Sequence, residues 1–131
     1  MSNVQQLPIG VFDSGVGGLS VLKVLQEQFP NEDFIYIGDN ANNPVGNRSD
    51  DEITYLACHI AEALEKKPVK LMVIACNTFT VVALDAVRER VSVPVIGVSQ
   101  GVKTAISQSK SKTIGIMATV APVNSHIHKH V

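Results

Sequence analysis

Residues 71–80 read LMVIACNTFT, and this stretch decides the fold class. Its first part, 71–75, is apolar without alternation, which predicts a strand buried on both faces. The apolar residues that follow recur at helical spacing, which predicts a helix over 78–90. Cys76 therefore lies in a strand-to-helix turn, where Asn77 or Thr78 can cap the helix and first-turn N–H groups can face a ligand.

The position of Cys76 suggests a reactive thiol. A thiol at a helix N-terminus feels the positive end of the helix dipole, which lowers its pKa and favours the thiolate. The carboxylate of Asp13, expected nearby, would oppose this effect, so the predicted net lowering of the pKa is modest. A buried, inert cysteine is an equally open interpretation, because free cysteines are often buried.

Outward from this stretch, apolar runs alternate with helical patterns. Expected strands cover 8–12, 34–37, 71–75, 93–98 and 113–117, and expected helices cover 17–29, 49–66, 78–90, 101–107 and a last one from Pro122. The inward-facing residues expected in the first two helices are Leu19, Leu22, Val24 and Leu25, then Ile53, Leu56, Ile60, Ala61 and Leu64. This order predicts an α/β fold, a parallel sheet with helices on both faces, whose site lies outside the carboxyl ends of the strands.

The composition excludes several classes of protein. The chain has 131 residues, enough for one domain, and is 45% hydrophobic, enough for a core. A net charge of −1 gives no electrostatic case for a nucleic-acid or membrane partner. No apolar run reaches the ~18 residues of a membrane span, and the first residues lack the pattern of a signal peptide. Two distant cysteines without CxxC spacing suit free thiols in a reducing cytoplasm.

Polar groups collect at the expected carboxyl ends of the strands. They are DSGVGG at 13–18, GDN at 38–40 with PVG at 44–46, and CNT at 76–78. Together these loops supply a carboxylate, hydroxyls, an amide, a thiol and backbone N–H groups, which suit a small anionic ligand. Taken singly, each loop is ordinary turn chemistry, and Asp39 could equally shape its loop or touch a ligand.

Three strings of the sequence resemble a known family. IGVFDSGVGGLSVL (9–22), FIYIGDNANNPVGNRS (34–49) and VIACNTFTVVAL (73–84) resemble the cofactor-independent aspartate/glutamate racemases, most closely their glutamate-specific members. The pairing of DSGVGG with ACNT about 60 residues later is specific in a way that a lone glycine-rich loop is not. The resemblance implies interconversion of L- and D-glutamate without a cofactor, for peptidoglycan synthesis in the bacterial cytoplasm.

The resemblance also implies roles for individual residues. Cys76 would be one of two catalytic thiols, each serving one face of the substrate α-carbon, because a weakly acidic α-proton needs a positioned base and the opposite face needs a donor. Asn77 and Thr78 would hold the substrate carboxylate or amine. Asp13 and Ser14 would bind substrate and help to position the Cys76 proton.

The loop at 44–46 is where the implied site departs most visibly from the family. The backbone of Val45 and Gly46 would contact substrate, but Val45 replaces the tyrosine of the family's Pro-Tyr-Gly. Asn40 and Asn42 stand where Thr and Arg are usual. Further on, Ser99-Gln100-Gly101 replaces Ile-Glu-Pro-Gly.

The family's second motif, Cys-Thr-His, lies beyond residue 131, because members are about twice this long. We therefore expect residues 1–98 to form the first lobe and 99–131 to open the second. We expect the chain alone to be inactive as a racemase. The alternative is a non-catalytic small-anion-binding or assembly module. Apolar surface that the missing lobe would cover predicts a homo-oligomer.

Other side chains could carry different chemistry. Cys58 lies mid-helix, away from the strand ends, and is expected to pack. His126 and His130 have the i, i+4 spacing that can suit Zn²⁺, but no Cys, Asp or Glu accompanies them, so with His128 they are expected to line a solvated helix and no metal is predicted. A phosphate site at GVGG (15–18) is the weakest alternative, because GVGG is neither GxGxxG nor a P-loop.

Overall fold

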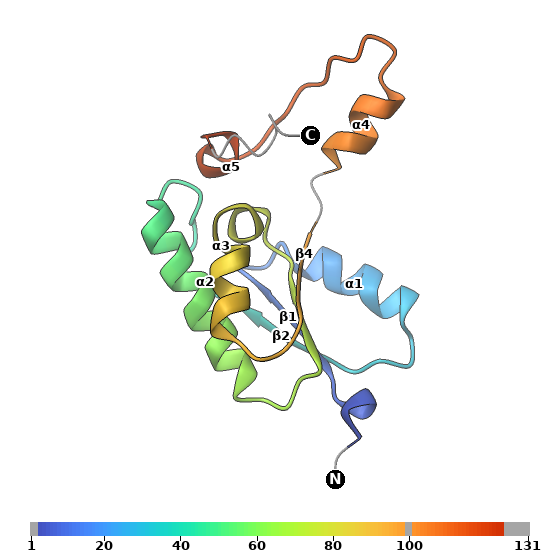
Figure 1. Cartoon of the computed structure of the whole chain (residues 1–131), viewed down its shortest axis with the longest axis vertical. Coiled ribbons are helices and arrows are strands. Elements are labelled where there is room, and N and C mark those ends of the chain that lie inside the picture. Colours follow the sequence, from blue (N-terminus) through green and yellow to red (C-terminus); the bar gives the residue numbers. More distant parts are fainter. Residues whose placement is uncertain (1–2, 99–100, 125–131) are drawn as a thin grey trace.

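The computed structural model describes residues 3–98 and 101–124. A four-stranded parallel sheet in the order β2-β1-β3-β4 forms its centre (Figure 1). The strands are β1 (Ile9–Asp13), β2 (Phe34–Gly38), β3 (Leu71–Ile74) and β4 (Val95–Gly97). The α-helices are α1 (Leu19–Gln28), α2 (Asp50–Glu65), α3 (Asn77–Arg90), α4 (Val102–Gln108) and α5 (Val120–Asn124), after a short 3₁₀ turn at Val4–Gln6. The predicted α/β fold with a parallel sheet is confirmed.

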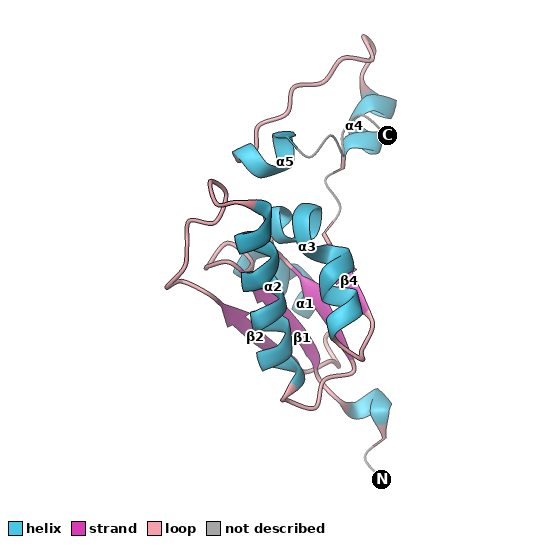
Figure 2. Ribbon diagram, turned by 60° about the vertical axis from the view of Figure 1, so that its left-hand side comes forward, coloured by secondary structure: helices cyan, strands magenta, loops and turns pink. Residues whose placement is uncertain are grey.

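Helices cover both faces of the sheet, but unequally. Helices α2 and α3 lie together on one face, and α1 lies on the other (Figure 2). Strand β3 is buried on both sides as predicted, because Met72 and Ile74 join the core under α2 and α3 while Val73 packs under α1. The sheet is therefore a two-sided platform that ends in the loops at its carboxyl edge.

Helix α2 forms where its sequence predicts it. Ser49 is the N-cap, its hydroxyl accepts from the Glu52 N–H, and the Glu52 carboxylate accepts from the Ser49 N–H, which together make a capping box. Four of the five expected inward residues are buried and Leu56 packs against them. Burial of this apolar stripe fixes α2 against the sheet.

Helix α1 departs from expectation in which residues face inward. Leu22 and Leu25 pack against Ile9, Val11 and Val73, as predicted. Leu19 and Val24 were expected inward as well, and that prediction is wrong, since they are 47% and 54% exposed. Among the described residues, α1 is the one helix that packs on this face, and the sheet buries only the centre of its apolar stripe.

The strand expected over 113–117 is not formed. These residues run as an extended connection between α4 and α5, away from the sheet (Figure 1). A strand needs a neighbour for its backbone hydrogen bonds, and within the described part of the chain nothing pairs with this segment. Met117 is fully exposed, and a Cβ added at Gly115 would meet no described atom within 4 Å, which agrees with an unpaired segment.

Two sets of residues singled out in the sequence lie outside the described residues: Ser99 with Gln100, and His126, His128 and His130. The interpretations that depend on them stay predictions. Among the residues that are described, no helix is both long and apolar enough to cross a membrane.

Candidate active site

Cys76 lies just after the end of β3 and caps α3 with its own sulfur. Its backbone is extended (φ −96°, ψ 124°), and its Sγ accepts a hydrogen bond from the Phe79 N–H at 3.4 Å. The expectation that Asn77 or Thr78 caps the helix is wrong, because both are already inside the first turn of α3. The first-turn N–H groups of a helix have no partner within it, so those of Asn77 and Thr78 are not used by the hydrogen bonds of α3 itself.

Ser14 meets Cys76 across the carboxyl edge of the sheet. The Cys76 thiol donates to Ser14 Oγ, with the two atoms 3.5 Å apart. This contact joins residues 62 apart in the sequence. It exists because β1 and β3 are parallel neighbours, and the Ala75 N–H continues their ladder by donating to the Phe12 carbonyl at 2.8 Å. The structure thus brings together the hydroxyl and the thiol that the sequence singled out.

Asp13 is buried and directs its carboxylate back into its own loop. Asp13 Oδ2 accepts from the Gly15 N–H at 3.2 Å and from the Gly18 N–H at 2.9 Å. Asp13 as a whole residue is only 6% exposed. These bonds close the turn that leads into α1. They also use two of the amides on which the alternative phosphate site would depend, which disfavours that alternative.

Burial raises the pKa of the Cys76 thiol above its usual value. Hydrogen bonds from Ser14 and Phe79 lower it, the Asp13 carboxylate raises it, and the net shift is upward. The sequence-based prediction of a modestly lowered pKa is therefore wrong. Desolvation of the charged form outweighs the stabilisation that the helix N-terminus provides. At neutral pH Cys76 is a thiol, ready to donate a proton.

The loop after β2 packs against the first loop. Asp39 accepts from the Asn42 N–H at 3.3 Å and from Asn42 Nδ2 at 2.8 Å, so it shapes its loop, which was one of the two roles considered for it. A Cβ added at Gly15 would lie 2.9 Å from Asn43 Nδ2. Because this approach is so close, the loops after β1 and β2 act as one surface.

Gly46 and Thr78 meet at Thr119, a residue to which the sequence patterns gave no role. Thr78 Oγ1 lies 3.1 Å from Thr119 Oγ1, within hydrogen-bond distance. A Cβ added at Gly46 would come 2.5 Å from the Thr119 Cβ. Val45 itself is 3% exposed with its side chain in the core. The signal for Thr119 was its place just before α5, where a hydroxyl residue is typical of a helix N-cap.

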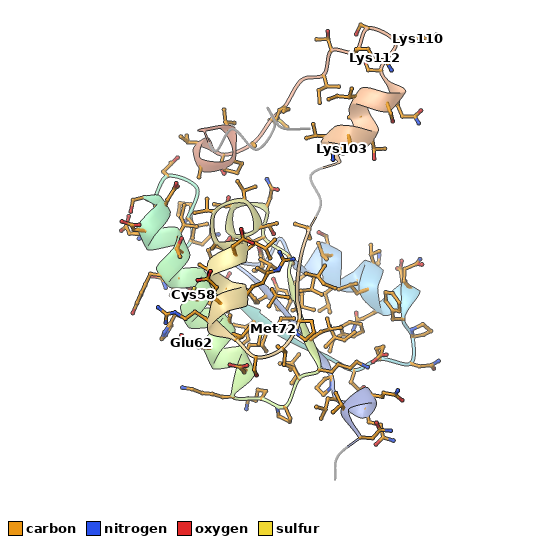
Figure 3. All side chains as sticks on the ribbon, in the orientation of Figure 1. Cys58, Glu62, Met72, Lys103, Lys110 and Lys112 are labelled. Carbon is orange, nitrogen blue, oxygen red and sulfur yellow. The ribbon has the colours of Figure 1, made fainter. Side chains whose placement is uncertain are left out.

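Cys58 lies away from this edge of the sheet. It projects from the middle of α2 (Figure 3) and shares a surface pocket with Arg90, the last residue of the helix that Cys76 caps. Burial raises the pKa of the Cys58 thiol. In the part of the chain that is described, no group of three or more His, Cys, Asp or Glu side chains could hold a metal ion.

Comparison with known proteins decides the family. A family model described as Asp/Glu/Hydantoin racemase matches residues 9–131. This chain belongs to that racemase family. The glutamate racemase of Herpetosiphon aurantiacus is 49% identical over 116 residues, which are 88% of this chain and 46% of that protein. The chain thus spans about half the length of the curated racemases that it matches.

Solved glutamate racemases share the fold. That of Aquifex pyrophilus superposes with a TM-score of 0.88 at 42% identity, covering 95% of this chain and 50% of that one. That of Francisella tularensis, solved in complex with D-glutamate, superposes with a TM-score of 0.81 at 40% identity, covering 95% and 47%. The racemase fold therefore accounts for the sheet and for the loops at its carboxyl edge.

Proposed function

We propose that this chain is the first half of a glutamate racemase, in which Cys76 exchanges the α-proton on one face of glutamate. The observation that carries the proposal is the contact between Cys76 Sγ and Ser14 Oγ at the carboxyl edge of the sheet, in a chain 49% identical to a glutamate racemase. Support for glutamate as substrate comes from the related enzyme of Francisella tularensis, which was solved with D-glutamate bound. In this proposal residues 1–98 form the first lobe and 99–131 open the second.

The chemistry assigned to Cys76 is a proton transfer. As a thiolate, its sulfur takes the α-proton and leaves a carbanion conjugated with the substrate carboxylate. The free N–H groups of Asn77 and Thr78, at the positive end of α3, are suited to stabilise that negative charge. The backbone of Val45 and Gly46 gives further contacts. A second thiol then protonates the opposite face, which inverts the centre, and this step needs no cofactor.

Because the pKa of Cys76 is raised, the free protein favours proton donation over proton abstraction. A neutral thiol can donate to a carbanion but cannot abstract a proton. Arrival of the substrate ammonium group near the sulfur would lower the pKa of the thiol, because an opposite charge favours the ionised form. Asp13 and Ser14 contribute by holding the turn beside the sulfur and by offering the thiolate a hydroxyl donor.

The wider biological assignment follows from the same proposal. D-glutamate is used in peptidoglycan, so the protein would serve cell-wall biogenesis and cell shape from the cytoplasm. Its partners would be glutamate and further copies of itself, without nucleic acid or membrane. The 131-residue chain has two cysteines, and Cys58 is remote from the site. On this basis the chain alone should bind glutamate but should not racemise it appreciably.

Solvent deuterium separates the two halves of the reaction. A single thiol that removes and returns a proton on one face exchanges the α-proton without inversion. In D₂O, proton NMR of the chain with L- or D-glutamate should show slow loss of the α-proton signal for one enantiomer only, while circular dichroism shows no racemisation. Cys76→Ala is the blank and Cys58→Ala the matched control.

Each result has a defined meaning. Exchange abolished by C76A but not by C58A supports the proposed role of Cys76. Robust, Cys76-dependent loss of optical activity would contradict the inactivity of the single chain and would imply a second base supplied across a subunit interface. Binding of glutamate with no exchange at any pH would favour the alternative, a non-catalytic small-anion-binding module. If the chain showed neither glutamate binding nor α-proton exchange, the proposed function would be refuted.

A further inference from the structure

Tyr36, on β2, contacts the loop after β1 through its hydroxyl. Its hydroxyl donates to the Gly15 carbonyl at 2.7 Å, across 21 residues of sequence. The ring packs with Val11 and Val73 on the α1 face of the sheet. Gly15 directly follows Ser14, the residue that contacts Cys76. Tyr36 therefore holds the backbone at the point where that hydroxyl is presented to the thiol.

Further contacts make this hold specific. A Cβ added at Gly18 would lie 2.9 Å from the Tyr36 hydroxyl, so the hydroxyl sits inside the turn that Asp13 closes. A Cβ added at Gly38, the last residue of β2, would overlap the same Gly15 carbonyl oxygen. The end of β2 thus contacts the Gly15 carbonyl in two ways: the Tyr36 hydroxyl donates a hydrogen bond to it, and Gly38 packs against it.

We propose that Tyr36 is a positioning residue for the proton-transfer site and that it acts through Ser14. By fixing the Gly15 carbonyl, it fixes the turn that keeps Ser14 Oγ within reach of Cys76 Sγ. The inference rests on the proposed role of Cys76. It extends that role to a side chain whose own polar contact is to backbone rather than to substrate.

The electrostatics of Tyr36 agree with this role. Burial, then the Asp13 carboxylate, then Cys76 raise the pKa of the Tyr36 hydroxyl to about 12. The hydroxyl therefore stays protonated and remains a donor to Gly15 whether Cys76 is thiol or thiolate. Besides burial, the groups that shift the pKa of the Cys76 thiol are Asp13, Ser14 and the Phe79 N–H. In this proposal Tyr36 fixes the position of Ser14.

The test is the pH profile of Cys76 alkylation in Tyr36→Phe. Phenylalanine keeps the ring packing but releases the Gly15 carbonyl. Because a hydrogen bond from Ser14 favours the thiolate, its loss should raise the midpoint of the profile by about half a unit to one unit, which at pH 8 slows alkylation about threefold to tenfold. Iodoacetamide labelling resolved by mass spectrometry reads Cys76 and Cys58 separately in one sample.

The matched control is Tyr55→Phe. Tyr55 is 68% exposed on α2, where it stacks on His59, so its hydroxyl does not touch the site. Neither thiol should change its profile in Y55F, and Cys58 should not change in Y36F. A merely structural loss in Y36F would instead move both thiols together with the urea midpoint. Gly38→Ala, which presses on the same carbonyl, is a second variant that tests the proposal independently.

A double-mutant cycle with Ser14→Ala decides whether Tyr36 acts through Ser14. If it does, S14A should raise the Cys76 midpoint, and Y36F/S14A should raise it no further. Additive shifts, or a Y36F profile equal to wild type while S14A shifts, would overturn the proposal. No substrate is present in the alkylation assay, so a negative result there counts against the role of Tyr36 alone. The racemase assignment is tested separately by the deuterium exchange.

Discussion

Replacing Asp13 by alanine tests whether its carboxylate holds the first loop. The change removes the acceptor of the Gly15 and Gly18 N–H groups, at 3.2 and 2.9 Å. Hydrogen bonds to a charged group contribute about 1.5–3 kcal/mol each. Because one bond is long and water can enter the vacated turn, we expect Asp13→Ala to lower the free energy of unfolding by about 2–4 kcal/mol.

The assay is urea unfolding at pH 7, followed by far-UV circular dichroism. With a slope of about 1–3 kcal/mol per molar urea, a loss of about 3 kcal/mol moves the midpoint down by roughly 1–3 M. Asp13→Asn keeps an oxygen acceptor and should lose only about 1 kcal/mol. Asp85→Ala is the matched control, because its carboxylate is exposed and, among the described residues, forms its ion pair with Arg88.

A refuting result is easy to state. If D13A and D85A unfold at the same urea concentration, the carboxylate does not hold the turn. It would then be free to face a ligand, as the family resemblance first suggested. If D13A is destabilised but still binds glutamate, the role of Asp13 is to shape the loop and its contact with substrate is dispensable.

Three further outcomes follow from burial. Cys76 has a raised pKa in the folded state, so the stability it contributes is complete below about pH 8.5, where the unfolded thiol is also neutral. That stability falls as pH rises toward the folded pKa, so urea midpoints of wild type should decline above pH 8.5 more than those of Cys76→Ser. Leu64→Ala should cost about 2–5 kcal/mol in a thermal or urea melt, because Leu64 is fully buried, and Leu56→Ala, only partly buried, should cost less. Light scattering at micromolar concentration should show a homodimer or larger, since apolar residues such as Ile96, on the outer strand β4, are exposed, and a clean monomer would contradict that expectation.

The fold could be predicted because its main signals are local. The unalternating run at 71–75 and the cap at Ser49 specify their elements within a few residues. The prediction of a strand over 113–117 was wrong because a strand needs a neighbouring strand to pair with, and the local pattern does not show whether one is there. The inward-facing residues of α1 were predicted only in part for a similar reason. The apolar stripe shows which side of the helix faces the sheet, but not how much of that stripe the sheet buries.

The sequence predicted where Cys76 lies in the fold but not the electrostatics of its thiol. The strand-to-helix pattern located Cys76 beside the first loop. The sign of its pKa shift depends on burial by residues far away in sequence, which a local helix-dipole argument omits. Tyr36 and Thr119 were missed for the same reason, because their importance lies in contacts across 21 and 41 residues.

Two polar groups that the sequence offered as ligand contacts hold their own loops in the structure. Asp13 accepts from the amides of its own turn, and Asp39 accepts from Asn42. The other groups that the sequence singled out at this edge of the sheet are neutral: a thiol, hydroxyls and backbone amides. Neutral donors contribute about 1 kcal/mol each, so a few of them support only weak binding, on the order of millimolar. In the proposed function these groups would supply positioning and one proton transfer, and tight binding of glutamate would require charge that they do not carry.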